Sequence, residues 1–198
     1  MSRKILLING KKSFAHSHGR YNDTLHDTAL FFLTGQNHQI KTTFIDDGYD
    51  AEEEVEKWLW ADTIIYQMPC WWMGIPWIVK RYIDEVFTEG HGRLYANDGR
   101  SRSAPERHYG SGGLIQGKQY MISVTWNAPE SAFTDPDDFF EGKGLDAVYY
   151  SFHKAHEFLG MTHLPSFICN DVIKEPNPER DVERYTEHLK KVFSSPSA

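Results

Sequence analysis

Ile5-Leu6-Leu7-Ile8-Asn9-Gly10 is the stretch of sequence that decides the fold. Four consecutive apolar residues leave the strand no polar side, so the run predicts a strand that is buried on both faces. Strands of this kind belong to parallel sheets that helices cover on both sides. After Gly10 the chain is polar up to Asn22, and apolar residues then recur at helical spacing until Gly35, a residue suited to end a helix.

Strands and helices alternate along the rest of the chain. Short apolar runs predict further strands at residues 40–45, 63–66, 120–125 and 164–168. Helical spacing of apolar residues predicts helices at residues 51–60, 76–87, 145–160 and 185–193. The second and fifth strands are more polar or contain proline, which favours the two edges of a sheet. The predicted architecture is α/β: a flavodoxin-like doubly wound five-stranded parallel sheet in the order 2-1-3-4-5, with helices on both faces.

Length and composition limit the class of protein. A chain of 198 residues has single-domain size, so we expect one domain over residues 1–198, with a polar loop excursion at about residues 88–118. A net charge of −7 argues against a nucleic-acid partner. Two cysteines make no disulfide framework, and the first apolar run is too short for a signal peptide, which predicts a cytoplasmic protein. The uncharged segment 63–79 is too short for a bilayer span, so we expect no integral membrane contact.

The loop after the first strand has the features of an anion site. In such sheets ligands bind outside the carboxyl ends of the strands, and a helix N-terminus there binds phosphate. Hydrogen-bonding groups, a glycine and local positive charge occur together here: Ser17, Asn22, Thr24, Gly19, Lys11, Lys12, His16 and Arg20. The loop therefore predicts a phosphate or pyrophosphate site, and the alternative is a solvated loop with an ordinary helix cap.

Aromatic residues gather in the loops after the third and fourth strands. Trp71 and Trp72 are adjacent, so they do not both point into one core, and they suit the wall of a flat cavity or an interface with another subunit. Trp126 and Asn127 follow the next strand. Tyr109, flanked by Gly110-Ser111-Gly112-Gly113, is either a mobile cover for the same crevice or part of a simple loop. A flat ring with a phosphate tail fits this combination, and flavin fits best.

Motifs in order along nearly the whole chain strengthen this interpretation. They are Asn9-Gly10, His16-Ser17-x-Gly19-x-x-Asn22-Asp23-Thr24, Gln67-Met68-Pro69-x-Trp71-Trp72-Met73-Gly74, Phe87-Thr88-Glu89-Gly90-His91-Gly92, Tyr109-Gly110-Ser111-Gly112-Gly113 and Thr125-Trp126-Asn127-Ala128. In these motifs the chain resembles the modulator-of-drug-activity-B family of flavoprotein quinone reductases. The resemblance implies a homodimer that binds FAD and reduces a small-molecule quinone with NADPH, by ping-pong hydride transfer through the flavin.

The resemblance also implies which residues bind the cofactor. They are Ser17, Gly19, Arg20, Tyr21, Asn22, Asp23, Thr24, Pro69, Cys70, Trp71, Trp72, Tyr109, Thr125, Trp126, Asn127 and Ala128. Cys70 stands where the family usually has glycine, which places a thiol near the ring. We expect backbone N–H groups of the Trp71 and Trp126 loops to polarise the flavin ring. The rings of these residues, with Trp72 and Tyr109, are expected to sandwich the quinone.

The sequence names no clear proton donor. His108 and Tyr109 are the catalytic candidates, with solvent as the alternative. Four arginines of the excursion are candidates for the 2′-phosphate of NADPH, or are simply solvated: Arg93, Arg100, Arg102 and Arg107. The histidine pairs 16/18 and 153/156 lack cysteine or carboxylate partners at zinc spacing, so no metal site is predicted.

Two other functions remain open from the sequence. One is azo or nitro reduction on the same fold. The other is a flavin-binding regulatory subunit of an ion-efflux system, which predicts a partner surface and slow or dispensable turnover. The tryptophans near the pocket fit both of these readings.

Overall fold

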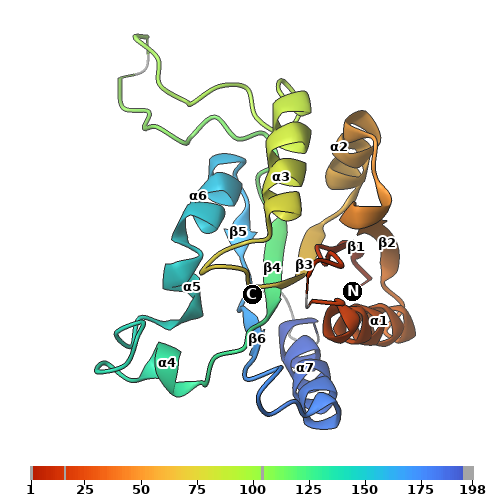
Figure 1. Ribbon diagram of the computed structural model, residues 1–198. Coiled ribbons are helices and arrows are strands. Elements are labelled where there is room, and N and C mark those ends of the chain that lie inside the picture. The colour runs from red at the N-terminus through yellow and green to blue at the C-terminus, as the bar shows by residue number, and fades with distance from the viewer. Residues whose placement is uncertain (1, 16, 104, 194–198) are drawn as a thin grey trace.

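A parallel sheet forms the centre of the molecule. The structure is a computed structural model that describes residues 2–15, 17–103 and 105–193 (Figure 1). The strands are β1 (Lys4–Asn9), β2 (Gln39–Phe44), β3 (Thr63–Pro69), β4 (Gln119–Thr125), β5 (Thr162–His163) and β6 (Phe167–Cys169). They are hydrogen-bonded in the order β2-β1-β3-β4-β5, and β6 also pairs with β4. The predicted doubly wound sheet and its order are confirmed.

The expected fifth strand at residues 164–168 has the wrong bounds. It is split into β5 and β6, and both segments pair parallel with β4. Pro165 lies between them and has no N–H to donate to the ladder. The split edge leaves His163 at the end of one short strand and Cys169 at the end of the other.

Helices cover both faces of the sheet. They are α1 (Arg20–Gly35), α2 (Ala51–Trp60), α3 (Trp77–Glu89), α4 (Ser131–Thr134), α5 (Gly144–Val148), α6 (Tyr150–Phe158) and α7 (Pro178–Phe193), with a 3₁₀ turn, η1 (Ile45–Asp47). Figure 1 shows α1 and α7 side by side on one face of the sheet, and these two helices are in contact. Helices α2, α3 and α6 supply buried residues to the core on the other face.

The position of strand β1 in the sheet explains why its sequence has no polar side. Leu6 and Ile8 belong to the core shared with α2, α3 and α6. Ile5 and Leu7 belong to the core shared with α1 and α7. All four side chains are fully buried, because successive residues of a strand point to opposite faces and both faces are covered.

The helices differ from the prediction mainly in their bounds. The helix at 51–60 is confirmed, and Asp50 caps it by accepting a hydrogen bond from the Glu53 N–H at 3.0 Å. The single helix expected at 145–160 is two helices, α5 and α6, which meet at Tyr149. Helix α7 begins at Pro178 rather than at 185. The prediction missed its first turns because they are polar and lack the apolar spacing that marks its buried face.

The polar excursion projects beyond the ends of α3 and α6, at the upper left of Figure 1. Its two arms meet where the Ala96 N–H donates to the Gly112 carbonyl at 2.9 Å. Gly113 lies so close to the end of α6 that an added Cβ would be 2.1 Å from the Leu159 carbonyl carbon. The excursion is therefore anchored to α6. Within the described residues, no helix combines the length and apolarity that a membrane span requires.

Candidate functional site

A cleft of about 2050 Å³ opens at the carboxyl ends of β1, β3 and β4. The three loops read from the sequence meet here, as expected for this type of sheet. Most of the proposed cofactor residues line the cleft: Ser17, Gly19, Arg20, Tyr21, Asn22, Pro69, Cys70, Trp71, Trp72, Tyr109, Thr125 and Asn127. Asp23, Thr24, Trp126 and Ala128 are not among its lining residues.

The N-terminus of α1 faces the cleft. Its first residue is Arg20, and the preceding Gly19 has a φ of 70° and makes no side-chain cap. Gly19 is required there, because a Cβ would meet the Lys11 side chain at 2.7 Å and the backbone is left-handed. An uncapped helix start beside an arginine attracts an anion.

The lysines of the first loop do not contribute as expected. Lys11 pairs with Asp23, and Lys12 pairs with Asp46. Asp23 also accepts a hydrogen bond from the Asn9 side-chain amide at 3.1 Å, so it holds the loop against β1. His16 lies outside the described residues. In this loop the positive charge at the cleft therefore comes from Arg20 and the helix N-terminus.

Three buried polar side chains form the floor beneath this helix start. The Gln67 amide donates to the Asn22 side-chain oxygen at 2.9 Å, and the Asn22 amide donates to the Thr125 hydroxyl at 3.0 Å. These residues come from β3, α1 and β4. The bonds fix the relative positions of the three elements that form the cleft, since a broken buried hydrogen bond leaves an unsatisfied polar group.

A tight turn presents the tryptophans. Trp71 and Gly74 exchange backbone hydrogen bonds at 3.1 and 3.2 Å. Trp72 and Met73, between them, have φ values of 48° and 59°, a left-handed conformation that is unusual for such residues. The Trp72 ring is 95% exposed, while the Trp71 ring packs on Phe14 with centroids 5.6 Å apart. The turn thus holds an unpartnered indole at the mouth of the cleft.

Trp126 is not a wall of the cleft, contrary to the expectation. Its ring is buried and packs edge-on against Phe133, Phe140 and Tyr149. The side chain points into the core because it follows a strand whose alternation directs it there. The ring therefore does not face the cleft.

Two of the backbone N–H groups in the loops named from the sequence are occupied. The Trp71 N–H bonds to Gly74, and the Trp126 N–H donates to the Cys169 carbonyl at 2.9 Å. These two N–H groups are not free to polarise a bound ring. Asn127 serves another purpose as well, because its side-chain oxygen accepts hydrogen bonds from the Ile173 and Lys174 N–H groups at 3.1 and 3.0 Å.

Thr24 and Ala128 make local bonds instead of lining the cleft. The Thr24 hydroxyl donates to the Arg20 carbonyl at 3.1 Å, one helical turn before it. The Ala128 carbonyl accepts from the Asn170 side-chain amide and from the Asp171 N–H, each at 3.1 Å. Both residues therefore shape neighbouring segments.

Cys70 lines the cleft, but its thiol is not activated. Burial raises the pKa of Cys70 to about 11, although hydrogen bonds involving Tyr149 and the turn lower it in part. The thiol is therefore protonated at neutral pH, and a protonated thiol is a poor nucleophile.

The two catalytic candidates have different positions. Tyr109 lines the cleft and is 70% exposed, with its ring 5.6 Å from that of Phe158. His108 is exposed and is not a lining residue. The structure thus brings only one of the two to the cleft.

The four arginines of the excursion are also absent from the cleft lining. Arg93 pairs with Glu56, and Arg100 pairs with Asp98. Arg102 and Arg107 are exposed. Besides Arg20, five charged side chains that the sequence analysis missed line the cleft: Lys80, Arg81, Asp84, Glu85 and Lys154.

Helical spacing could have revealed these charged residues. Val79, Tyr82, Ile83 and Val86 form the buried side of α3. The opposite side carries Arg81, which donates to Glu85 at 2.8 Å one turn later. What the sequence lacks is the information that this polar face borders the cleft rather than open solvent.

The histidine pair 153/156 does not act as a pair. His156 is buried and bonds to the Tyr66 hydroxyl at 2.9 Å, and burial lowers its pKa to about 3. His153 points elsewhere and lies close to Asp146 and His163. Neither of these two residues belongs to the 153/156 spacing pattern. The spacing argument against a carboxylate partner was therefore wrong for His153.

Known proteins are similar to this chain in sequence. A family model described as having a flavodoxin-like fold matches residues 3–192. An NADPH:quinone oxidoreductase MdaB from Haemophilus influenzae is 58% identical over 189 residues, which cover 96% of this chain and 98% of the relative.

Solved structures agree on the fold. A Klebsiella pneumoniae structure is 24% identical with a TM-score of 0.78, over 98% of this chain and 86% of the other. A general stress protein from Treponema denticola, solved in complex with FMN, is 14% identical with a TM-score of 0.64, over 97% and 96%. The chain therefore belongs to the flavodoxin-like family and, within it, to the modulator-of-drug-activity-B group of oxidoreductases.

Proposed function

We propose that this protein is a flavoprotein that reduces quinones with NADPH. The main support for this proposal is the cleft itself. An uncapped helix start beside Arg20 lines one part of it, and exposed indoles line another. An anion site next to an aromatic wall suits a cofactor with a phosphate tail and a flat ring. The name of the Haemophilus relative supports NADPH and quinone as the two substrates.

The residues of the cleft fit a flavin. Gly19 provides the left-handed backbone before the start of α1, and the Pro69–Trp72 segment supplies a wall beside the hydrogen-bonded Gln67 and Asn22 side chains. FAD is our choice over FMN because the cleft exceeds the ~300–1,000 Å³ of common ligand sites and has room for a dinucleotide. The FMN of the Treponema structure supports a flavin but favours the smaller form.

The chain's own residues position the reactants. A bound flavin would carry two electrons from NADPH to the quinone, as ping-pong hydride transfer requires. Arg20 and the α1 N-terminus would hold the phosphates, and Trp71, Trp72 and Tyr109 would flank the ring face and exclude water. Tyr109 is the one proposed proton donor on the cleft, and solvent is the alternative.

A homodimer completes the proposal. Trp72, Trp77 and Tyr109 line the cleft and are 95%, 53% and 70% exposed. Large exposed rings gathered at one place suit an interface. A second copy of the chain would cover these rings and close the cleft. We further propose that residues 1–198 act as one cytoplasmic domain.

The proposal is tested on purified protein. We expect the visible absorption bands of oxidised flavin, released as FAD when the protein is denatured, and NADPH oxidation that menadione stimulates. A colourless protein that takes up no added flavin would refute the cofactor. Bound flavin without menadione-stimulated turnover would favour the regulatory function, and faster turnover with an azo or nitro compound would favour that chemistry.

The anion site has its own test. Arg20→Ala should weaken FAD affinity by about 10- to 150-fold, since a hydrogen bond to a charged group contributes about 1.5–3 kcal/mol. Arg102→Ala is the matched control, because Arg102 is exposed outside the cleft. Fluorescence titration of the flavin-free protein measures both. Equal affinities for the two variants would place the phosphates elsewhere.

A further inference from the structure

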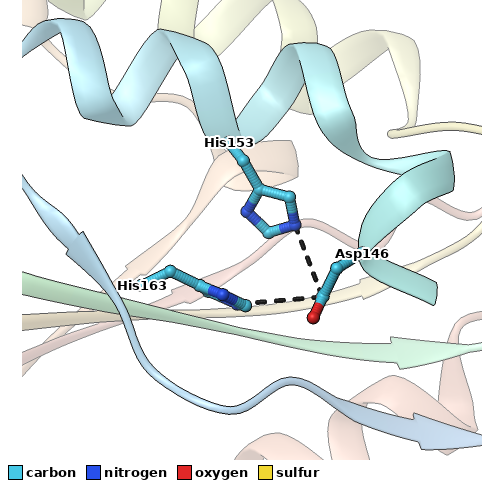
Figure 2. Close-up of side chains that lie close together, drawn as sticks. All are labelled: Asp146, His153 and His163. Atoms are coloured by element: carbon cyan, nitrogen blue, oxygen red, sulfur yellow. Dashed lines mark ion pairs between the residues drawn. The ribbon is translucent and has the colours of Figure 1, made fainter. Parts of the chain in front are cut away.

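Three side chains that do not line the cleft converge on one point. His153 of α6, Asp146 of α5 and His163 of β5 each direct a ligand atom toward the others, as Figure 2 shows. These three atoms lie within 4.8 Å of one another. We propose that Asp146, His153 and His163 form a binding site for one Zn²⁺ ion.

The distances suit a tetrahedral ion. Zinc binds nitrogen and oxygen ligands at about 2.0–2.2 Å, which separates neighbouring ligand atoms by about 3.4 Å in a tetrahedron. His153 Nε2 lies 3.4 Å from Asp146 Oδ1, and His163 Nε2 lies 3.8 Å from the same oxygen. His163 Nε2 also lies 2.9 Å from the Ser166 hydroxyl, so His163 would exchange that hydrogen bond for the ion, and water would fill the fourth position.

Polar neighbours orient two of the ligands. His153 Nδ1 lies 2.7 Å from the Tyr120 hydroxyl, and the Ser166 hydroxyl donates to Asp146 Oδ1 at 2.5 Å. In the tautomer whose Nδ1–H donates to the phenol oxygen, His153 keeps its Nε2 lone pair for the ion. Outer hydrogen bonds of this kind accompany zinc-bound histidines.

One ligand atom is buried without a hydrogen bond. His153 Nε2 makes none in the described part of the chain, and its contact with Asp146 Oδ1 is 3.4 Å long. A buried polar atom without a hydrogen bond costs free energy, and a metal ion between the two side chains would satisfy both. Two imidazole nitrogens and one carboxylate favour zinc over magnesium or calcium, which prefer oxygen ligands throughout.

The site is separate from the cleft. None of Asp146, His153 and His163 is a lining residue, whereas Ser151, Lys154 and Ala155 of the same helix are. The ion would tie α5, α6 and the split edge strand together. It would therefore stabilise the wall of the cleft without touching a substrate.

Zinc titration of the chelator-treated full chain tests the proposal, by calorimetry and thermal unfolding. We expect one Zn²⁺ per chain and a higher melting temperature, since an ion that binds only the folded state stabilises it. Asp146→Asn and His163→Ala should each weaken binding at least about tenfold. Circular dichroism without metal checks that the variants fold.

Two control variants match the ligands in chemistry. Asp138→Asn alters a half-buried carboxylate that also accepts a serine hydroxyl bond, and His91→Ala removes an exposed loop histidine. Both should bind zinc as the unchanged protein does. The proposal is overturned if the unchanged protein shows no saturable binding, or if the ligand and control variants bind alike. Activity is not the readout, so this result is independent of the proposed quinone reduction.

Discussion

Two groups of aromatic rings behave oppositely in this molecule. In the cleft, Trp72 and Trp77 are exposed. In the core between the sheet and helices α2, α3 and α6, Trp58 and Tyr66 are fully buried and each has a polar partner. The indole N–H of Trp58 donates to the Tyr82 hydroxyl at 2.9 Å, and Tyr82 in turn donates to Glu54 at 2.6 Å.

The difference shows that the aromatic rings of this protein fall into two groups, according to whether they have a packing and hydrogen-bonding partner within the fold. A buried ring with a satisfied polar tip supports the fold. An exposed ring on a strained turn has no structural partner, so it is available to a ligand or another subunit. Variants of Trp58 and Trp72 test these two roles directly, and the buried histidines and Cys70 test the effect of burial on titratable side chains.

The largest effect is expected for Trp58. Trp58→Ala should lower the free energy of unfolding by about 3–5 kcal/mol, because it leaves a cavity and removes a partner of Tyr82. Trp58→Phe should cost less, since most of the ring volume stays. Urea unfolding of flavin-free protein, followed by circular dichroism, measures both. A loss below about 1 kcal/mol for the alanine variant would contradict the assigned role.

Buried histidines should make the fold sensitive to acid. Burial lowers the pKa of His26 to about 4 and that of His156 to about 3, from an ordinary value of 6.5. Below pH 6.5 the unfolded chain therefore binds protons that the folded chain refuses. Stability should be fully present above pH 6.5 and fall as the pH drops toward 4.

Each such histidine contributes a slope of up to about 1.4 kcal/mol per pH unit. His26→Leu should reduce the slope by about that amount, since both ring nitrogens of His26 lack partners in the described part of the chain. Urea unfolding at a series of pH values gives the slope. The exposed His91 serves as the control, and His91→Leu should leave the slope unchanged.

Trp72 should affect ligands and not the fold. Trp72→Ala should change the free energy of unfolding by less than about 0.5 kcal/mol, because the ring is almost fully exposed. The KM for menadione should rise up to about tenfold, the range of one aromatic stacking contact. Steady-state kinetics and urea unfolding check the pair of expectations. A large stability loss with unchanged kinetics would reverse the comparison.

Cys70 should have the smallest effect. Its raised pKa of about 11 keeps the thiol protonated, so iodoacetamide should modify it slowly at neutral pH and faster as the pH rises toward 11. Cys70→Ala should change kcat by less than about twofold, since the thiol takes part in no step. Mass spectrometry follows the modification. Rapid labelling at neutral pH would show an activated thiol.

The strand order and the three ligand loops could be predicted because they depend on local patterns. The apolar run at residues 5–8 requires burial on both faces, and Gly19 precedes a helix start. The inward direction of Trp126 was missed, although Ile122 and Val124 of β4 and the Trp126 that follows alternate into one core. Phe133 and Phe140 complete the packing around its ring.

Charge partners were equally beyond the sequence. Lys11 counts as a free positive charge in the printed chain, but folding places Asp23 beside it. Arg100 is likewise neutralised by Asp98. Pairing depends on side-chain geometry over several ångströms, which composition and spacing do not contain.

The sequence by itself determined a parallel sheet, its order and the end at which the cleft opens. Apolar runs and helical spacing specify burial directly, and burial of both faces admits few topologies. Only the tertiary structure decided which rings face the cleft and which lysines are neutralised. It also brought Asp146 and His163 to His153, because residues from α5 and β5 meet α6 only when the split edge of the sheet packs beneath that helix.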